Sequence, residues 1–173
     1  MYYWGVRRRW LPRRVVLYAL GGSIISGCIV AVLVWAHLRS PIPATLRHDI
    51  QFGIFLPETS AHIEQASYKY DKSLGVLSFT ARLPSGQIAT FAEQATPEAF
   101  TDIPTYYDKL LTKLHNYSTF DTPIGTVHLT HPTGVGQAAV MSTKGTLLFV
   151  RVDHDEPITT WRQLFGHMVT YQP

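Results

Sequence analysis

Histidine and acidic residues are the first candidates for chemistry in this chain. His128 and His131 lie three residues apart, and Asp153-His154-Asp155-Glu156 forms an acidic run. Two histidines at this spacing do not share a face of a strand, and a zinc site needs more ligands. The acidic run lacks the glycine and the remaining oxygen ligands of a calcium loop. We therefore predict no metal and no cofactor, with surface or turn histidines and a solvated acidic turn near the start of a helix.

Nucleophilic catalysis has no recognisable residue pattern either. The single cysteine, Cys28, lies inside an apolar stretch, and the chain has no G-x-S-x-G elbow. Ser85 precedes Gly86 and is interpreted as a turn residue. Sequence spacing does not reveal a glycosidase-type carboxylate pair, so a membrane-tethered hydrolase stays an alternative. We predict that the chain is not an enzyme.

Aromatic side chains are a second kind of candidate, because they could line an exposed groove for a sugar or a peptide. Tyr107 fits the core face of a helix, and Tyr68 and Tyr70 fit one face of a strand, so core packing is the favoured interpretation. The full candidate set is Tyr68, Tyr70, Tyr106, Tyr107, Tyr117 and Phe120.

The stretch from Val15 to Ala36 contains 22 residues and no formal charge. A helix of this length covers about 33 Å, enough for a hydrocarbon core of about 30 Å. We therefore predict residues 15–36 to be a transmembrane helix. A cleaved signal peptide is the alternative, although its apolar region is ordinarily shorter than this one.

The arginines are segregated at the start of the chain. Arg7, Arg8, Arg9, Arg13 and Arg14 precede the apolar stretch, and Arg39 follows it closely. The positive-inside rule then predicts residues 1–14 as a basic cytoplasmic tail and the C-terminal domain outside the cell membrane. From residue 41 onward the chain has nine Lys and Arg against twelve Asp and Glu, a net charge of 9 − 12 = −3. We therefore expect the lipid bilayer as a partner and no nucleic acid.

Small residues in the predicted span indicate a packing surface. Gly22 with Ser26, and Ser23 with Gly27, form two overlapping small-xxx-small pairs. Such pairs let helices approach closely, so another membrane helix or an envelope protein is a further expected partner. Small residues are common in membrane helices without pairing, and that alternative stays open.

Residues 37–49, with two prolines in Ser40–Leu46, are predicted to form an extended stalk, and residues 50–173 an α+β domain. Alternating apolar residues predict strands at 48–56, 63–70, 75–83, 87–94, 124–130, 137–142 and 146–152, with a turn at 119–123. Helical spacing predicts amphipathic helices from Ile103 to Asn116 and over 157–169. Thr101 or Asp102 and a Thr160–Gln163 capping box are the expected caps. Hairpin connections favour an antiparallel β-sheet with both helices packed on one face.

Several short motifs resemble a family of small uncharacterised bacterial extracytoplasmic domains that follow a single membrane helix. These motifs are Phe55-Leu56-Pro57, the strand pair at 75–83 and 87–94, Gly125-Thr126-Val127, Gly145 to Phe149, and a last helix with Trp161 and Leu164. Some members are anti-sigma-factor-like or sporulation-related. The resemblance implies an exposed α+β domain and brings no catalytic residues. A tail of 14 residues departs from a sigma-binding protein, which needs a cytoplasmic domain.

Together these features predict a single-pass membrane protein whose outer domain binds or senses an unidentified ligand without catalysis. A small structural subunit of an envelope membrane complex is the alternative, followed by the tethered hydrolase.

Overall fold

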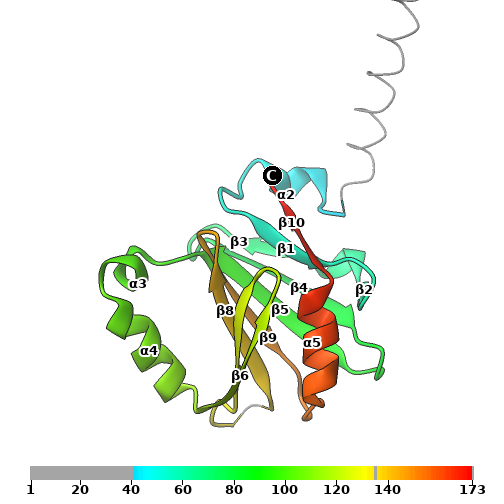
Figure 1. Ribbon diagram of the computed structural model, residues 1–173. Coiled ribbons are helices and arrows are strands. Elements are labelled where there is room, and N and C mark those ends of the chain that lie inside the picture. The colour runs from blue at the N-terminus through cyan, green and yellow to red at the C-terminus, as the bar shows by residue number, and fades with distance from the viewer. Residues whose placement is uncertain (1–40, 135, 173) are drawn as a thin grey trace, which may run out of the picture. The chain divides into compact units, whose positions relative to one another are not determined.

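The structure is a computed structural model that describes residues 41–134 and 136–172 (Figure 1). The chain divides into two compact units, Met1–Pro41 and Ile42–Pro173, and the elements below belong to the second. This unit is a small α+β domain with antiparallel sheets and few helices, as the sequence predicts.

The main sheet is built from hairpins. Its strands follow the order β2-β4-β5-β9-β8-β7-β6, and β3 also pairs with β4. The bounds are β2 His62–Ile63, β3 Lys69–Asp71, β4 Val76–Arg82, β5 Ile88–Ala95, β6 Asn116–Thr122, β7 Gly125–Thr130, β8 Ala138–Thr143 and β9 Thr146–Arg151.

Two predicted hairpins are confirmed. The β4–β5 pair brings Phe79 opposite Phe91, and their rings stack with centroids 4.6 Å apart. The β8–β9 pair turns at Lys144 and Gly145, which both have positive φ angles of 48° and 77°. This backbone twist suits a two-residue turn between antiparallel strands.

Strand β6 corrects one prediction, since the turn expected at 119–123 is in fact strand as far as Thr122. Phe120 is the one fully buried side chain of β6, and the strand is otherwise polar. The apolar alternation that identifies a half-buried strand is therefore weak here. The single strand predicted at 63–70 is instead two short strands, β2 and β3, separated by a 3-10 helix, η1 (Gln65–Ser67).

A second, two-stranded sheet joins the first and last strands of the described chain. β1 (Ile54–Pro57) pairs antiparallel with β10 (Met168–Tyr171). The strand predicted at 48–56 thus begins only at Ile54, after the short helix α2 (Ala44–Arg47). The last helix, α5 (Ile158–Gly166), is shorter than expected, because Met168 and Val169 belong to β10.

The helix predicted from Ile103 is preceded by a separate one. α3 (Glu98–Asp102) and α4 (Pro104–Lys113) break at Ile103, whose φ and ψ are −132° and 83°. A residue before proline avoids the helical region, which explains the break. The expected side-chain caps are absent in α4 and α5, where Ile103 and Pro157 occupy the N-cap positions without a side-chain hydrogen bond.

α4 and α5 contact opposite faces of the main sheet (Figure 1). The ring of Phe165 on α5 meets Phe120, whereas the ring of Tyr107 on α4 meets His128. Phe120 is paired with Val127, the neighbour of His128 on β7, so the two contacts lie on different faces. The prediction that both helices cover one face is therefore wrong.

The core lies on the face covered by α5 and the β1–β10 sheet. We call this the inner face, and the face that meets α4 the outer face. The largest fully buried side chains include Trp161, Phe55, Phe79, Phe91, Phe165, Leu77 and Leu148. The inner face is thus sealed from solvent by elements from both ends of the domain.

The first testable prediction concerns Gly136, before β8. A Cβ there would overlap the backbone oxygens of Val152 and Asp153, in the segment where the Val152 amide donates to the Gln137 carbonyl at 3.0 Å. Gly136→Ala should lower the free energy of unfolding by roughly 2 kcal/mol or more. Urea denaturation of the full-length chain in detergent measures this loss.

Gly166→Ala is the control, because beyond the adjoining residues and the backbone of its own helix no described atom lies within 4 Å of the Cβ that it adds. It should be neutral or slightly stabilising. Equal stability of the Gly136→Ala and Gly166→Ala proteins would contradict the close approach.

Candidate functional site

The predicted membrane segment and its residues lie outside the described residues. This holds for Arg7, Arg8, Arg9, Arg13 and Arg14, and for Gly22, Ser23, Ser26 and Gly27. Within residues 41–134 and 136–172, the helices are all too short or too polar to cross a bilayer.

His128 and His131 are not brought together. His128 lies on β7, facing Tyr107, whereas the ring of His131 stacks on Tyr117 with centroids 4.6 Å apart. His131 Nδ1 lies 3.7 Å from the exposed carboxylate of Asp155. In the described part of the chain, no three histidine, cysteine or carboxylate side chains are placed to hold a metal ion.

The acidic run after β9 is not entirely solvated, which corrects the prediction for Glu156. Asp153 and Asp155 are exposed, but Glu156 is buried. Its carboxylate accepts hydrogen bonds from the Ser85 hydroxyl and, at 2.8 Å, from Gln87 Nε2. Glu156 therefore ties the β4–β5 turn to the start of α5.

Gln137 extends this network across the core. Its side-chain oxygen accepts from the Glu156 amide at 2.9 Å and from Trp161 Nε1 at 2.6 Å. Its Nε2 donates to the hydroxyl of Tyr117 on β6. The buried amide thus satisfies polar groups from three separate elements, as buried polar groups require.

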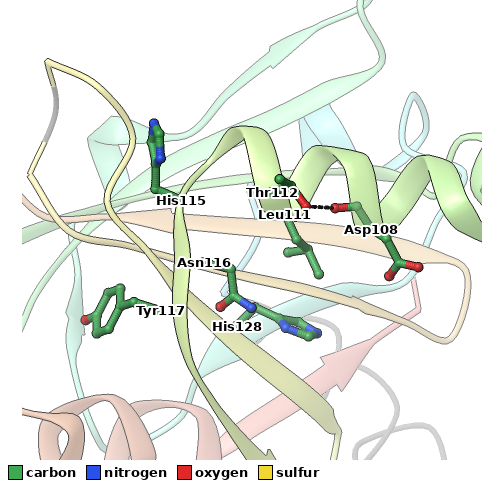
Figure 2. Close-up of a pocket in the computed structure, with 7 residues that line it drawn as sticks. All are labelled: Asp108, Leu111, Thr112, His115, Asn116, Tyr117 and His128. Carbon is green, nitrogen blue, oxygen red and sulfur yellow. Dashed lines mark hydrogen bonds between the residues drawn. The ribbon is translucent and has the colours of Figure 1, made fainter.

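An open groove lies on the outer face, between α4 and the strands β6 and β7. Its volume is about 640 Å³, and it is lined by Asp108, Leu111, Thr112, His115, Asn116, Tyr117 and His128. Figure 2 shows the side chains of Asn116 and His128 lying close together, whereas His115 and Tyr117 point away from them. We call this the α4–β7 groove.

His128 is the most informative residue of the α4–β7 groove. Its Nδ1 atom is buried and has no hydrogen-bond partner among the described residues. Burial lowers the pKa of its imidazole, and the nearby negative charge of Asp108 only partly opposes this effect. At neutral pH the ring is therefore uncharged and keeps one nitrogen as a donor and the other as an acceptor.

The groove exists because α4 covers the outer face thinly. Leu111 is the one buried residue of this ten-residue helix, and Asp108, three residues before it, and Thr112, directly after it, are exposed. Three elements contribute polar side chains to the groove: Asp108 comes from α4, Asn116 from the edge strand β6, and His128 from β7. Carboxylate, amide and imidazole groups in one groove can both donate and accept hydrogen bonds, which suits the binding of a polar ligand.

Glu93 on β5 is a second notable polar residue, sealed inside the inner face. Its Oε2 accepts a hydrogen bond from the Phe55 amide at 2.9 Å, and its Oε1 has no partner among the described residues. Burial raises the pKa of Glu93 to about 8, although the Phe55 hydrogen bond acts in the opposite direction. The buried hydroxyl of Tyr68 is likewise without a partner, and burial together with the charge of Glu93 raises its pKa.

Glu93 is not among the residues predicted from the sequence, although its position in the strand pattern indicates it. Ala89, Phe91 and Glu93 alternate along one strand, so the predicted apolar face of residues 87–94 already contained a carboxylate. Glu93 and the α4–β7 groove are on opposite faces, because Glu93 faces the core and His128 faces α4.

Comparison of the chain with protein-family models, with curated proteins and with solved structures returns no match. The resemblance noted from short motifs therefore stays a prediction.

Glu93 generates the second prediction, on the pH dependence of stability. The pKa of its carboxyl is higher in the folded than in the unfolded chain, so the folded state binds more protons between about pH 4.5 and pH 8. The stability conferred by the neutral carboxyl is complete below that window and is lost as the pH rises through it. Glu93→Gln keeps an acceptor for the Phe55 amide but does not ionise. Its free energy of unfolding should therefore fall less from pH 5 to about pH 8 than that of the parent, as measured by urea denaturation.

The exposed Glu98 provides the matched control for this experiment. Glu98→Gln should keep the pH slope of the parent protein. Identical slopes in the parent and in Glu93→Gln would contradict the protonated, buried state of Glu93.

A third prediction tests the Gln137 network. Gln137→Ala removes the acceptor of both the Trp161 indole and the Glu156 amide inside the core. Leaving two buried donors unpaired should cost roughly 2 to 4 kcal/mol of unfolding free energy in urea titrations. Gln94→Ala, at a half-buried position of β5, should cost much less, and a reversed order would refute the role of Gln137.

Proposed function

We propose that this chain is a single-pass membrane protein whose outer domain binds a ligand in the α4–β7 groove, without catalysis. The observation that carries the binding site is an open groove of about 640 Å³ whose lining includes the carboxylate of Asp108, the amide of Asn116 and the imidazole of His128. Small-molecule sites commonly have volumes of about 300 to 1,000 Å³ and a few convergent polar groups.

The sequence supports the membrane part of this proposal. Residues 15–36 carry no charge, and five arginines precede them between Arg7 and Arg14. With residues 1–14 inside the cell, the domain that begins at Ile42 faces outside. A groove on that domain is then presented to molecules outside the membrane.

Binding fits the groove better than catalysis does. A histidine base is ordinarily oriented by a hydrogen bond from one ring nitrogen to a carboxylate or carbonyl. Among the described residues, His128 Nδ1 has no such partner, and Asp108 acts on it only as a nearby charge. The groove thus holds hydrogen-bonding groups without an assembled acid–base pair.

The test is a thermal-melting screen of the full-length protein in detergent. The probes are neutral oligosaccharides and short peptides of defined sequence, each added at a series of concentrations. A ligand that binds only the folded state raises the melting temperature as its concentration rises. His128→Phe, which removes the polar atoms and fills the groove, should abolish the shift.

His154→Phe makes the same change at an exposed histidine outside the groove and should keep the shift. A ligand whose shift is equal in His128→Phe and in the parent would place the binding site elsewhere and contradict the proposal.

A further inference from the structure

Strand β6 forms an open edge of the main sheet beside the α4–β7 groove. It pairs with β7 on one side, and no described strand pairs with it on the other. Asn116 and Tyr117 of β6 line the groove, so the edge and the groove form one continuous surface. We call this surface the β6 edge.

We propose, on the basis of the function proposed above, that the ligand is an extended, positively charged polypeptide segment. It adds as a strand along the β6 edge and places side chains in the α4–β7 groove.

The backbone of β6 supplies the first argument. In an antiparallel pair, every second residue directs its amide and carbonyl away from the partner strand. β6 is seven residues long, and among the described residues these outward groups meet no backbone partner. An edge of this kind is a template for another extended chain, which satisfies it with main-chain hydrogen bonds.

The residues of β6 do little to block such pairing. Its sequence, NYSTFDT, has no proline and no lysine, the residues that commonly protect an edge. The register irregularity lies between Asn116 and Ser118, at the start of the strand, and pairing with β7 is regular from Ser118 to Thr122. The regular part leaves five consecutive residues as a pairing surface.

Charge identifies the chemistry of the segment. Asp121 on β6 and Asp108 in the groove are both exposed carboxylates. Asp121 accepts a hydrogen bond from the Thr126 hydroxyl at 2.7 Å, which holds it in place on the hairpin without neutralising it. The guanidinium of Arg162 lies over the ring of Phe120, on the inner face, away from the groove. Asp121 and Asp108 therefore offer two carboxylates to lysine or arginine side chains of an incoming strand, while Lys109 on α4 is turned to the Tyr106 ring.

A sugar fits this surface less well than a peptide. Sugar rings bind proteins chiefly by stacking on free aromatic faces. The ring of Tyr117 is already stacked on His131, and Lys109 Nζ lies 5.1 Å from the centroid of the Tyr106 ring. Each of these two exposed tyrosines thus has one ring face occupied, whereas the backbone edge of β6 has no partner strand among the described residues.

The experiment selects ligands without assuming a sequence. A displayed library of random peptides, about ten residues long so as to exceed a typical strand, is selected on the full-length protein in nanodiscs. The selected peptides should be enriched in lysine, arginine and β-branched residues. Their affinities are then measured by fluorescence polarisation with synthetic copies.

Alternate N-methylation of the peptide backbone tests strand pairing directly. Methylating one set of alternate amides should weaken binding by at least about tenfold, whereas methylating the other set should have little effect. Asp121→Lys should weaken binding to a similar degree. Asp102→Lys, the same charge reversal at an exposed position of α3, should leave the affinity unchanged.

The outcomes separate this inference from the proposed function. Peptides that tolerate both methylation patterns but fail to bind His128→Phe occupy the groove without pairing, which overturns the inference and keeps the proposed site. If the selection returns no peptide but an oligosaccharide raises the melting temperature, the inference is likewise overturned and the proposed site is kept. If the protein is a dimer in nanodiscs and Asp121→Lys dissociates it, the β6 edge belongs to a second copy of the chain. This result also overturns the inference. Peptides that bind His128→Phe and Asp121→Lys as tightly as the parent overturn both proposals.

Discussion

The hydrogen bond between Glu93 and the Phe55 amide is the contact on which the closure of the core depends. β1 pairs with β10 along one edge, and the bond from the Glu58 amide to the His167 carbonyl fixes which residues of β1 face β10. By the alternation of antiparallel pairs, the Phe55 amide points away from β10, toward the main sheet. There it needs an acceptor inside an apolar core, and Glu93 supplies it. The Thr146 hydroxyl, which donates to the Gly53 carbonyl at 2.7 Å, completes this buried attachment of the chain just before β1.

The two faces of the main sheet consequently differ in character. On the inner face, α5 and the β1–β10 sheet exclude water so completely that a carboxyl group stays protonated near neutral pH. On the outer face, α4 is anchored mainly by Leu111, and polar side chains remain within reach of solvent. The Gln137 network links the two, because it joins Tyr117 at the groove to Trp161 in the core. A densely packed interior thus holds one wall of the open groove.

The elements that the sequence predicts well are those whose local signals agree. The β4–β5 and β8–β9 hairpins combine strict alternation with glycine-containing turns at Gly86 and Gly145, and both are confirmed. β6 and β10 are missed because their form depends on neighbours: β6 on its pairing with β7, and β10 on a partner more than a hundred residues away. The α4–β7 groove could not be predicted for the same reason, since Asp108 and His128 meet only through tertiary packing. Glu93 could have been identified from the alternation of β5 alone, because it shares the buried face of the strand with Ala89 and Phe91.

We propose that the open groove between α4 and β6 is presented outside the membrane. The most direct measurement is cysteine labelling of intact cells, because Cys28 is the one native thiol and can be replaced by serine. In that background, Asn116→Cys places a single thiol at the exposed mouth of the groove. If the groove faces outside, this thiol reacts rapidly with a membrane-impermeant maleimide before the cells are permeabilised. Labelling that requires permeabilisation would contradict it.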